Sequence, residues 1–246
     1  MQFSGFQKLT LLDFPGHVAC TLFTAGCNFR CPFCHNASLV THIDKNHFYS
    51  EEEILVYLKK RKGLMDGVCI TGGEPLMNKE LPEFIAKVKE LGYKVKLDTN
   101  GSYPDRLAAL IDSGNIDYVA MDIKNCKDKY LLTADCGQEQ LISVQKSIEL
   151  LKQKKVDFEF RTTVVKEYHT VDDIKKIAEW IEGTDKYFLQ NFIDSGDLIK
   201  NNLSAVNSKN LDLMRVAAQD MIPKVEIRGI YHKILCILLL TNHEIN

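Results

Sequence analysis

The chain lacks the features that mark nucleic-acid-binding and membrane proteins. Its 246 residues carry 31 Lys and Arg against 33 Asp and Glu, for a formal net charge of -2. No surplus of positive charge is available to attract nucleic acid or an anionic membrane surface. The apolar run at residues 234–240 is far shorter than a membrane span, and we expect it to be a packed or frayed tail. The sequence therefore predicts a protein that binds neither nucleic acid nor membranes.

Signs of export are also missing. The first eight residues have none of the basic and apolar tracts of a secretory signal peptide. Of the eight Cys, three lie close together and five are scattered, at Cys20, Cys69, Cys126, Cys136 and Cys236. Scattered thiols are typical of a reduced chain rather than a disulfide framework. We expect a cytoplasmic protein, with Cys20 and Cys69 in the core. Cys126 and Cys136 leave open a second metal site or redox pair.

No low-complexity linker divides the chain. Its hydrophobic content of 45% is enough for one substantial core. We therefore expect a single domain over residues 1–246, with its core at about residues 16–230.

Strand-like and helix-like segments alternate along the sequence. Apolar runs rich in β-branched residues predict strands at residues 18–25, 67–71, 94–98, 118–122, 158–164, 187–191 and 224–228. Amphipathic stretches predict helices at residues 50–61, 80–91, 104–113, 138–152, 171–182 and 208–219. Strands separated by helices favour a parallel sheet with right-handed crossovers. With about six strands rather than eight, the expected fold is an α/β, incomplete (β/α)6 TIM-like barrel. Residues 125–137 form the longest expected irregular stretch, as a mobile loop over the site.

Three Cys within eight residues are the most specific feature of the chain. Cys27, Cys31 and Cys34 form a C-x3-C-x2-C pattern directly after the first predicted strand. They are too close together to be spread along a rigid element, so we expect one loop whose thiols face one group. A [4Fe–4S] cluster that only carries electrons is normally held by four Cys. Three ligands would leave one iron open for chemistry.

Other metal sites are compatible with the same residues. Cys31 to His35 matches C-x-x-C-H, the attachment pattern of c-type haem, which requires an exported chain. Cys27, Cys31, Cys34 and His35 are also a set of Cys3His zinc ligands, although no second ligand couple accompanies them.

The other polar motifs fall at the predicted carboxyl ends of strands. Gly72, Gly73 and Glu74 follow the second strand, Asp98 and Asn100 the third, and Asp122 and Lys124 the fourth. In parallel α/β folds these ends meet at one face, where sites are built. The Gly pair allows a close backbone approach, and its carbonyls and Glu74 are suited to an ammonium group. Ordinary turns explain each motif equally well by itself.

Charge and aromatic residues complete the candidate set. Asp98 and Asp122 repel each other unless a positive group such as Lys124 or a bound cation lies between them. Arg161, in an otherwise apolar strand, needs a partner, which is either an acidic side chain or a ligand. Phe29 and Phe33 lie between the Cys, where they shield the bound group or stack on a purine.

With these motifs, the sequence resembles the radical S-adenosylmethionine (SAM) superfamily. Within it, the chain is similar to the activating enzymes of glycyl radical enzymes, most closely those of anaerobic ribonucleoside-triphosphate reductases. The resemblance runs from Gly5 to Gly229. It is carried by C-x3-C-x2-C with an aromatic residue, Phe33, before the third Cys, and by Gly-Gly-Glu-Pro at residues 72–75.

The resemblance implies a set of cofactors and contacts. Cys27, Cys31 and Cys34 would hold a [4Fe–4S] cluster whose fourth iron binds the amino and carboxylate groups of SAM. Gly72, Gly73 and Glu74 would receive the SAM ammonium group. The remaining implied SAM contacts are Phe33, Asp98, Asn100, Asp122, Lys124 and Arg161. In some activating enzymes the positions of Asp98 and Asp122 help to hold a monovalent cation.

The implied reaction is reductive cleavage of SAM followed by hydrogen abstraction from a glycine of a protein partner. The implied partners are a glycyl radical enzyme and a flavodoxin- or ferredoxin-like electron donor, under anaerobic conditions. Pyruvate formate-lyase activating enzymes carry a His near residues 190–192, where this chain has Gln-Asn-Phe, which argues against that branch. Three alternatives remain: another glycyl radical enzyme as substrate, a small molecule such as a pterin, and a metal-bearing binding module without catalysis.

Overall fold

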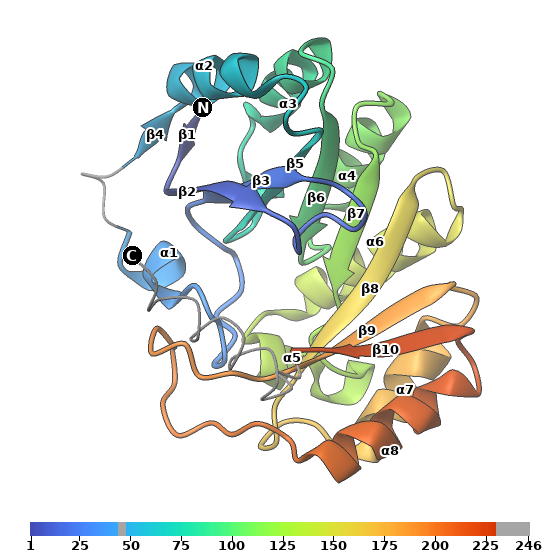
Figure 1. Cartoon of the computed structure of the whole chain (residues 1–246). Helices are drawn as coiled ribbons and strands as arrows, with labels where there is room; N and C mark the ends of the chain where they lie inside the picture. Colours follow the sequence, from blue (N-terminus) through green and yellow to red (C-terminus); the bar gives the residue numbers. More distant parts are fainter. Residues whose placement is uncertain (44–47, 230–246) are drawn as a thin grey trace, which may run out of the picture.

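The computed structural model describes residues 1–43 and 48–229, and its centre is one curved eight-stranded sheet (Figure 1). The strands lie in the order β10-β9-β8-β7-β6-β5-β3-β2. Their bounds are β2 Gly5–Thr10, β3 Ala19–Thr24, β5 Gly67–Gly72, β6 Lys94–Thr99, β7 Tyr118–Asp122, β8 Asp157–Val164, β9 Lys186–Asn191 and β10 Lys224–Arg228. All neighbours from β3 to β10 are parallel, and β2 pairs antiparallel with β3.

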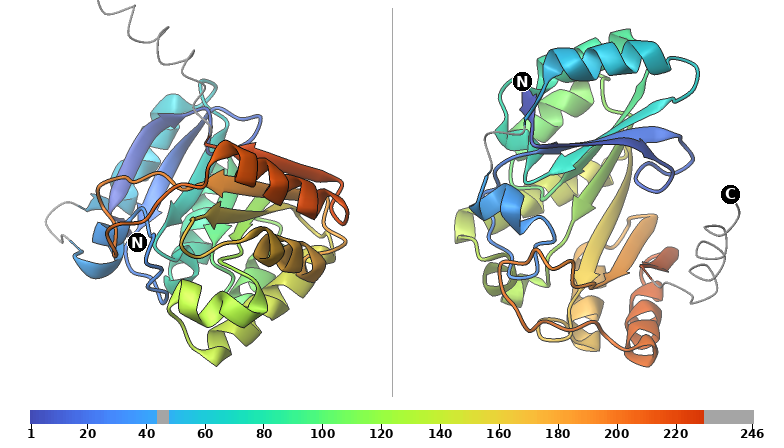
Figure 2. Two further views of the ribbon diagram at one scale, coloured as in Figure 1. Left: turned by 90° about the horizontal axis from the view of Figure 1, so that it is seen from below. Right: turned by 60° about the vertical axis from the view of Figure 1, so that its left-hand side comes forward.

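Helices cover the outer face of the sheet (Figure 2). They are α2 Glu51–Arg61, α3 Leu81–Glu90, α4 Pro104–Asp112, α5 Lys127–Ala134, α6 Gln138–Lys152, α7 Val171–Trp180 and α8 Ser208–Gln219, and the short α1, Ala37–Thr41, lies beside the loop that follows β3. A short 3-10 turn, η1, spans Pro75–Met77, and β1 (Gln2–Phe3) pairs with β4 (Tyr49–Ser50) in a separate two-stranded sheet. The alternation of strand and helix confirms the predicted α/β partial barrel.

The sequence-based helix starts are confirmed where capping residues mark them. Ser50 accepts a hydrogen bond from the Glu53 amide at 3.2 Å, and the Glu53 carboxylate accepts one from the Ser50 amide at 2.7 Å. This reciprocal capping box satisfies amide groups that have no partner within α2. α7 begins with the same arrangement at Thr170 and Asp173.

Side chains alternate between a dry outer face and a polar inner face of the sheet. On β6, Val95 and Leu97 are fully buried in the hydrophobic core. Lys94, Lys96 and Asp98 are on the opposite face because successive strand residues point to opposite sides. The core therefore lies between the sheet and its helices, and the inner face is left to polar and charged groups.

The prediction of an irregular loop at residues 125–137 is wrong. α5 occupies Lys127–Ala134 within it, and Tyr130, Thr133 and Ala134 are buried. Their spacing of three and four residues places them on one helical face. The segment is not strongly amphipathic beyond these residues, which hides the helix in the sequence. Asp135 ends α5 in the left-handed region, with φ 46°.

Several short elements have no counterpart among the predicted segments. They are β1, β2, β4, α1 and η1. The apolar run at residues 234–240 and Cys236 lie outside the described residues. Among the residues that are described, no helix has the length and apolar character needed to cross a membrane.

Candidate active site

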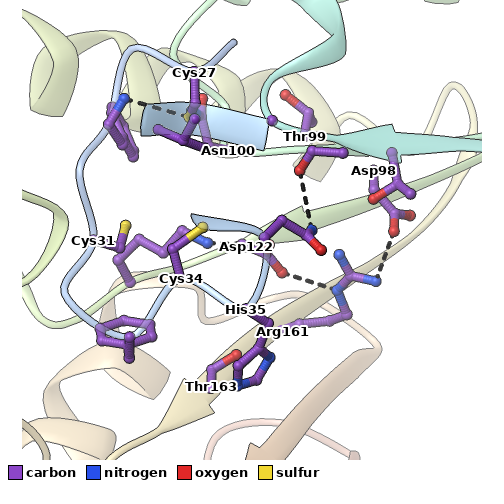
Figure 3. Close-up of a pocket in the computed structure, with 18 of the residues that line it drawn as sticks. Cys27, Cys31, Cys34, His35, Asp98, Thr99, Asn100, Asp122, Arg161 and Thr163 are labelled. Atoms are coloured by element: carbon purple, nitrogen blue, oxygen red, sulfur yellow. Dashed lines mark hydrogen bonds and ion pairs between the residues drawn. The ribbon is translucent and has the colours of Figure 1, made fainter. Parts of the chain in front are cut away.

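The predicted site residues meet at the carboxyl ends of the parallel strands. The loop after β3 carries Cys27, Cys31 and Cys34, which line one cavity together with side chains from five other strands (Figure 3). The further lining residues that the sequence predicted are Phe33, Gly72, Gly73, Asp98, Asn100, Asp122, Lys124 and Arg161. Of the predicted set, only Glu74 does not line this cavity. The position at the strand ends is the one expected of a site in a parallel α/β fold.

Backbone hydrogen bonds fix the Cys loop on three sides. The Gly26 amide donates to the Leu39 carbonyl at 2.8 Å, and the Glu74 amide donates to the Gly26 carbonyl at 2.8 Å. On the far side, the Arg30 amide donates to the Ala134 carbonyl at the end of α5, at 3.1 Å. The loop is thus tied to its own flank, to the turn after β5, and to α5.

The surroundings of the three sulfurs suit a bound iron–sulfur group. The Phe29 amide and the Asn100 side-chain amide donate to Cys27 Sγ at 3.4 and 3.7 Å. Donors of this kind stabilise thiolates that ligate a cluster. Burial raises the pKa of Cys31 to about 12, opposed by nearby Lys124. A buried thiol of this kind ionises when a metal takes the place of its proton.

The sulfurs share a cavity without converging on one point. Across residues 1–43 and 48–229, no three His, Cys or acidic side chains gather tightly enough to hold a single metal ion. Figure 3 shows Cys31 and Cys34 close together on the loop, with Cys27 beside Asn100. A [4Fe–4S] cluster takes its thiolates on separate irons, so it requires ligands that surround a volume rather than a point.

Gly72 and Gly73 are required by the close approach of two loops. Gly72 has φ 116°, and a Cβ there would lie 2.3 Å from the Thr24 amide nitrogen. A Cβ on Gly73 would lie 1.9 Å from the Gly26 carbonyl oxygen. A side chain at Gly72 would displace the end of β3, and one at Gly73 would displace the start of the Cys loop. The Gly pair therefore brings the turn after β5 against the segment that carries Cys27.

Glu74 has a different position from the other predicted contacts. Its carboxylate is fully buried and accepts hydrogen bonds from the Asn100 amide at 2.7 Å, the Thr99 hydroxyl at 2.8 Å and the Leu76 amide at 3.0 Å. Burial raises its pKa to about 7, although these donors favour the ionised form. Glu74 thus joins the turn after β5 to the turn after β6.

A chain of charged residues crosses the cavity floor from β6 to β8. Arg161 NH1 lies 3.2 Å from Asp98 Oδ2, and Arg161 Nε lies 2.9 Å from Asp122 Oδ1 (Figure 3). Lys124 Nζ lies 3.1 Å from Asp122 Oδ2, and Lys96 pairs with Asp98 Oδ1. Burial would raise the pKa of Asp122, but Arg161 and Lys124 outweigh it and hold that pKa well below its usual range. Arg161 is therefore the positive group that offsets the repulsion between the carboxylates of Asp98 and Asp122.

The aromatic residues of the Cys loop have different neighbours. Phe33 lines the cavity and packs against Tyr168 and His169, with ring centroids 5.9 and 6.2 Å apart. Phe29 also lines the cavity and meets the ring of Tyr130 on α5 at 6.4 Å.

Sequence reasoning missed several residues of the site. His35, Asn36, Thr71, Thr99, Thr163 and Gln190 also line the cavity. Thr163 and Gln190 could be found from strand alternation, because each is two residues beyond an inward-facing side chain, Arg161 and Phe188. The same alternation indicates that Lys96 faces inward, since it precedes Asp98 by two residues on β6.

Comparison with known proteins agrees with this architecture. The family model of the Radical SAM superfamily matches residues 21–181. A Methanocaldococcus jannaschii protein named "Putative glycyl-radical enzyme activating enzyme MJ1227" is 36% identical over 77% of this chain and 79% of its own length. A second protein from that organism, "Putative glycyl-radical enzyme activating enzyme MJ1632", is 27% identical over 67% of this chain and 63% of its own.

A solved structure shows the same fold. The crystal structure of Streptococcus suis SuiB superposes with a TM-score of 0.69 at 14% identity. The match covers 92% of this chain and 52% of SuiB, so this chain spans about half of that protein.

The chain belongs to the Radical SAM superfamily, as the family model and the 36% identical relative show. It is therefore a radical SAM enzyme, and membership implies a [4Fe–4S] cluster and SAM as its cofactors. This favours the iron–sulfur interpretation of Cys27, Cys31 and Cys34 over the zinc and haem alternatives. The three thiols in one cavity, with amide donors at Cys27 Sγ, fit such a cluster.

Proposed function

We propose that this chain activates a glycyl radical enzyme, and that this partner is an anaerobic ribonucleoside-triphosphate reductase. The observation that carries the proposal is the joint cavity of the three Cys, the Gly72–Gly73 backbone and the charged chain from Asp98 to Lys124. The names of the two Methanocaldococcus relatives support a protein partner. The choice of reductase rests on the resemblance from Gly5 to Gly229.

In this proposal Cys27, Cys31 and Cys34 hold the cluster, and the protein positions SAM beside it. A reduced cluster held by these thiolates would supply the electron that cleaves SAM to methionine and a 5′-deoxyadenosyl group, which would take a hydrogen atom from a glycine Cα of the partner. The products would be methionine, 5′-deoxyadenosine and a partner that carries a glycyl radical. The electron comes from a flavodoxin- or ferredoxin-like donor. The protein contributes orientation and electrostatics, and the cofactors carry the chemistry.

The cavity offers complementary groups for both ends of the SAM amino acid. The backbone at Gly72 and Gly73 lines the cavity and is available to an ammonium group, and Lys124 and Arg161 supply positive charge for a carboxylate. Phe33 and Asn100 line the same cavity. Glu74 contributes by holding Thr99 and Asn100 in place. A monovalent cation near Asp98 and Asp122 stays a prediction, and so does the reduced, cytoplasmic setting.

The partner can be tested with three candidate substrates. The reconstituted protein is mixed anaerobically with SAM, reduced flavodoxin and an anaerobic ribonucleoside-triphosphate reductase, and electron paramagnetic resonance reports a glycyl radical. We expect the signal with the reductase and not with its Gly→Ala variant at the radical position. A signal only with pyruvate formate-lyase would move the proposal to another partner. Consumption of a pterin precursor without any protein partner would replace it with small-molecule chemistry.

A further inference from the structure

Lys96 is the one member of the charged chain that the proposed function has not used. Its side chain is 2% exposed and comes from β6, on the inner face of the sheet. It pairs with Asp98 Oδ1, and its Nζ lies 3.7 Å from Cys69 Sγ. A fully buried Lys is rare because its charge must be compensated. Among the described residues, Asp98 is the one carboxylate within ion-pair distance of Lys96 Nζ.

Every carboxylate oxygen of Asp98 and Asp122 already has a protein cation. Lys96 pairs with Oδ1 of Asp98 and Arg161 with its Oδ2. Arg161 also pairs with Oδ1 of Asp122, and Lys124 pairs with Oδ2 of Asp122. Three positive groups thus face two negative ones, and the five side chains carry a net charge of +1. Without Lys96 the remaining four would be neutral.

A surplus charge of +1 at this point has a functional consequence. A bound potassium or sodium ion between two carboxylates would give the site the same surplus, because it adds one positive charge. Lys96 supplies that charge from the chain itself. The surplus lies at the floor of a cavity that must accept a carboxylate if the proposed function holds.

We propose that Lys96 is a positioning residue that replaces a monovalent cation, so that this enzyme binds SAM without one. Lys96 acts through Asp98, which in turn orients Arg161 toward Asp122 and the ligand. The proposal rests on the proposed function, since it assigns the charge surplus to the SAM carboxylate. It is an alternative to the predicted monovalent cation near Asp98 and Asp122, and the salt comparison below decides between the two.

The first test compares SAM affinity in two salts of equal ionic strength, with either choline or potassium as the cation. Anaerobic calorimetry on the reconstituted wild type should give the same dissociation constant in both. Lys96→Met should bind SAM about tenfold more weakly in choline, because it loses one unit of charge, and potassium should recover the affinity. Lys94→Met is the matched control, since Lys94 is exposed and lies on the same face of β6 without a partner in Asp98.

A double variant separates charge from structure. Lys96→Met with Asp98→Asn restores the surplus of +1, so SAM binding should again become independent of potassium. Lys96→Arg keeps the charge and should behave as the wild type does. If the role of Lys96 were purely structural, neither potassium nor the added Asp98→Asn substitution would compensate for its loss. A wild type that binds SAM more tightly in potassium than in choline would overturn the proposal, as would a Lys96→Met variant with unchanged affinity in choline.

A second readout does not need the cluster or SAM. The melting temperature of the cluster-free wild type should be the same in the two salts, whereas Lys96→Met should melt higher in potassium. If the wild type binds no SAM at all, the proposed function fails, and these melting temperatures still decide the charge argument. Equal melting temperatures of Lys96→Met in both salts would overturn it.

Discussion

At the scale of single residues, the site is built from buried charges whose partners fix their positions. Glu74 shows this most clearly, because its sequence motif suggested a ligand contact and its buried carboxylate accepts hydrogen bonds that hold two turns together. The motif could be found from the sequence, but the direction of the side chain could not. That direction depends on donors at Thr99 and Asn100, which are distant in sequence and adjacent only after folding.

Glu74 should make folding stability depend on pH in a particular direction. Burial raises its pKa from 4.5 in the unfolded chain to about 7 in the folded protein. The folded state therefore binds the proton more tightly, and stability falls as pH rises from about 4.5 to about 7, by up to about 3 kcal/mol. Glu74→Gln cannot titrate, so the gap, taken as the unfolding free energy of the wild type minus that of the variant, should fall over that range.

Urea unfolding of the cluster-free proteins at about pH 5 and about pH 8 measures this gap. Glu182→Gln is the control, because Glu182 is exposed and should leave the pH dependence unchanged. A gap between wild type and Glu74→Gln that stays constant with pH would contradict the account.

At the scale of elements, α5 is the part of the site that the sequence concealed. Helices with clear capping boxes, such as α2 at Ser50, could be predicted because their signals are local. α5 has no side-chain cap and only three buried residues on one face, so its helical state depends on packing against the Cys loop. The carbonyl of Ala134 then accepts from the Arg30 amide and lies 3.7 Å from Cys31 Sγ.

The anchoring of α5 should control how firmly the Cys loop holds its cluster. Thr133 is fully buried and accepts a hydrogen bond from Asn125 Nδ2 at 2.9 Å. Thr133→Val removes that acceptor at constant shape, and we expect it to cost about 1–3 kcal/mol of unfolding free energy. We also expect the variant to lose its cluster to an iron chelator faster than the wild type does, as measured by the decay of the cluster's visible absorbance.

Two control variants bracket this effect. Thr133→Ser keeps the hydroxyl and should retain the cluster, and Leu132→Ala changes an exposed side chain of the same helix. A Thr133→Val variant that releases iron at the wild-type rate would show that α5 does not support the loop.

At the scale of the whole molecule, the order of strands and helices could be predicted because each strand carries buried apolar residues and is separated from the next by an amphipathic stretch. All seven parallel strands are found close to their expected bounds. β2 could not be predicted, since Gln7, Lys8 and Leu9 are exposed on this sheet edge and give no apolar signal. The strand ends also placed most of the site in advance, because parallel topology gathers them at one face.

The charge pattern of the interior was only partly predictable. Arg161 was expected to need an acidic partner or a ligand, and the structure pairs it with both Asp122 and Asp98 and adds Lys96 beside Asp98. Those contacts join side chains of three neighbouring strands, so they depend on a register that no single segment encodes.

The central claim, that Cys27, Cys31 and Cys34 hold a cluster that cleaves SAM, is tested most directly by product analysis. Wild type, Cys31→Ala and Cys20→Ala are reconstituted anaerobically with iron and sulfide, reduced with dithionite and incubated with SAM. The account predicts 5′-deoxyadenosine from the wild type and from Cys20→Ala, whose changed residue is a buried core thiol, and none from Cys31→Ala. Cleavage by Cys31→Ala at the wild-type rate, or a fully loaded wild type that forms no 5′-deoxyadenosine, would contradict it.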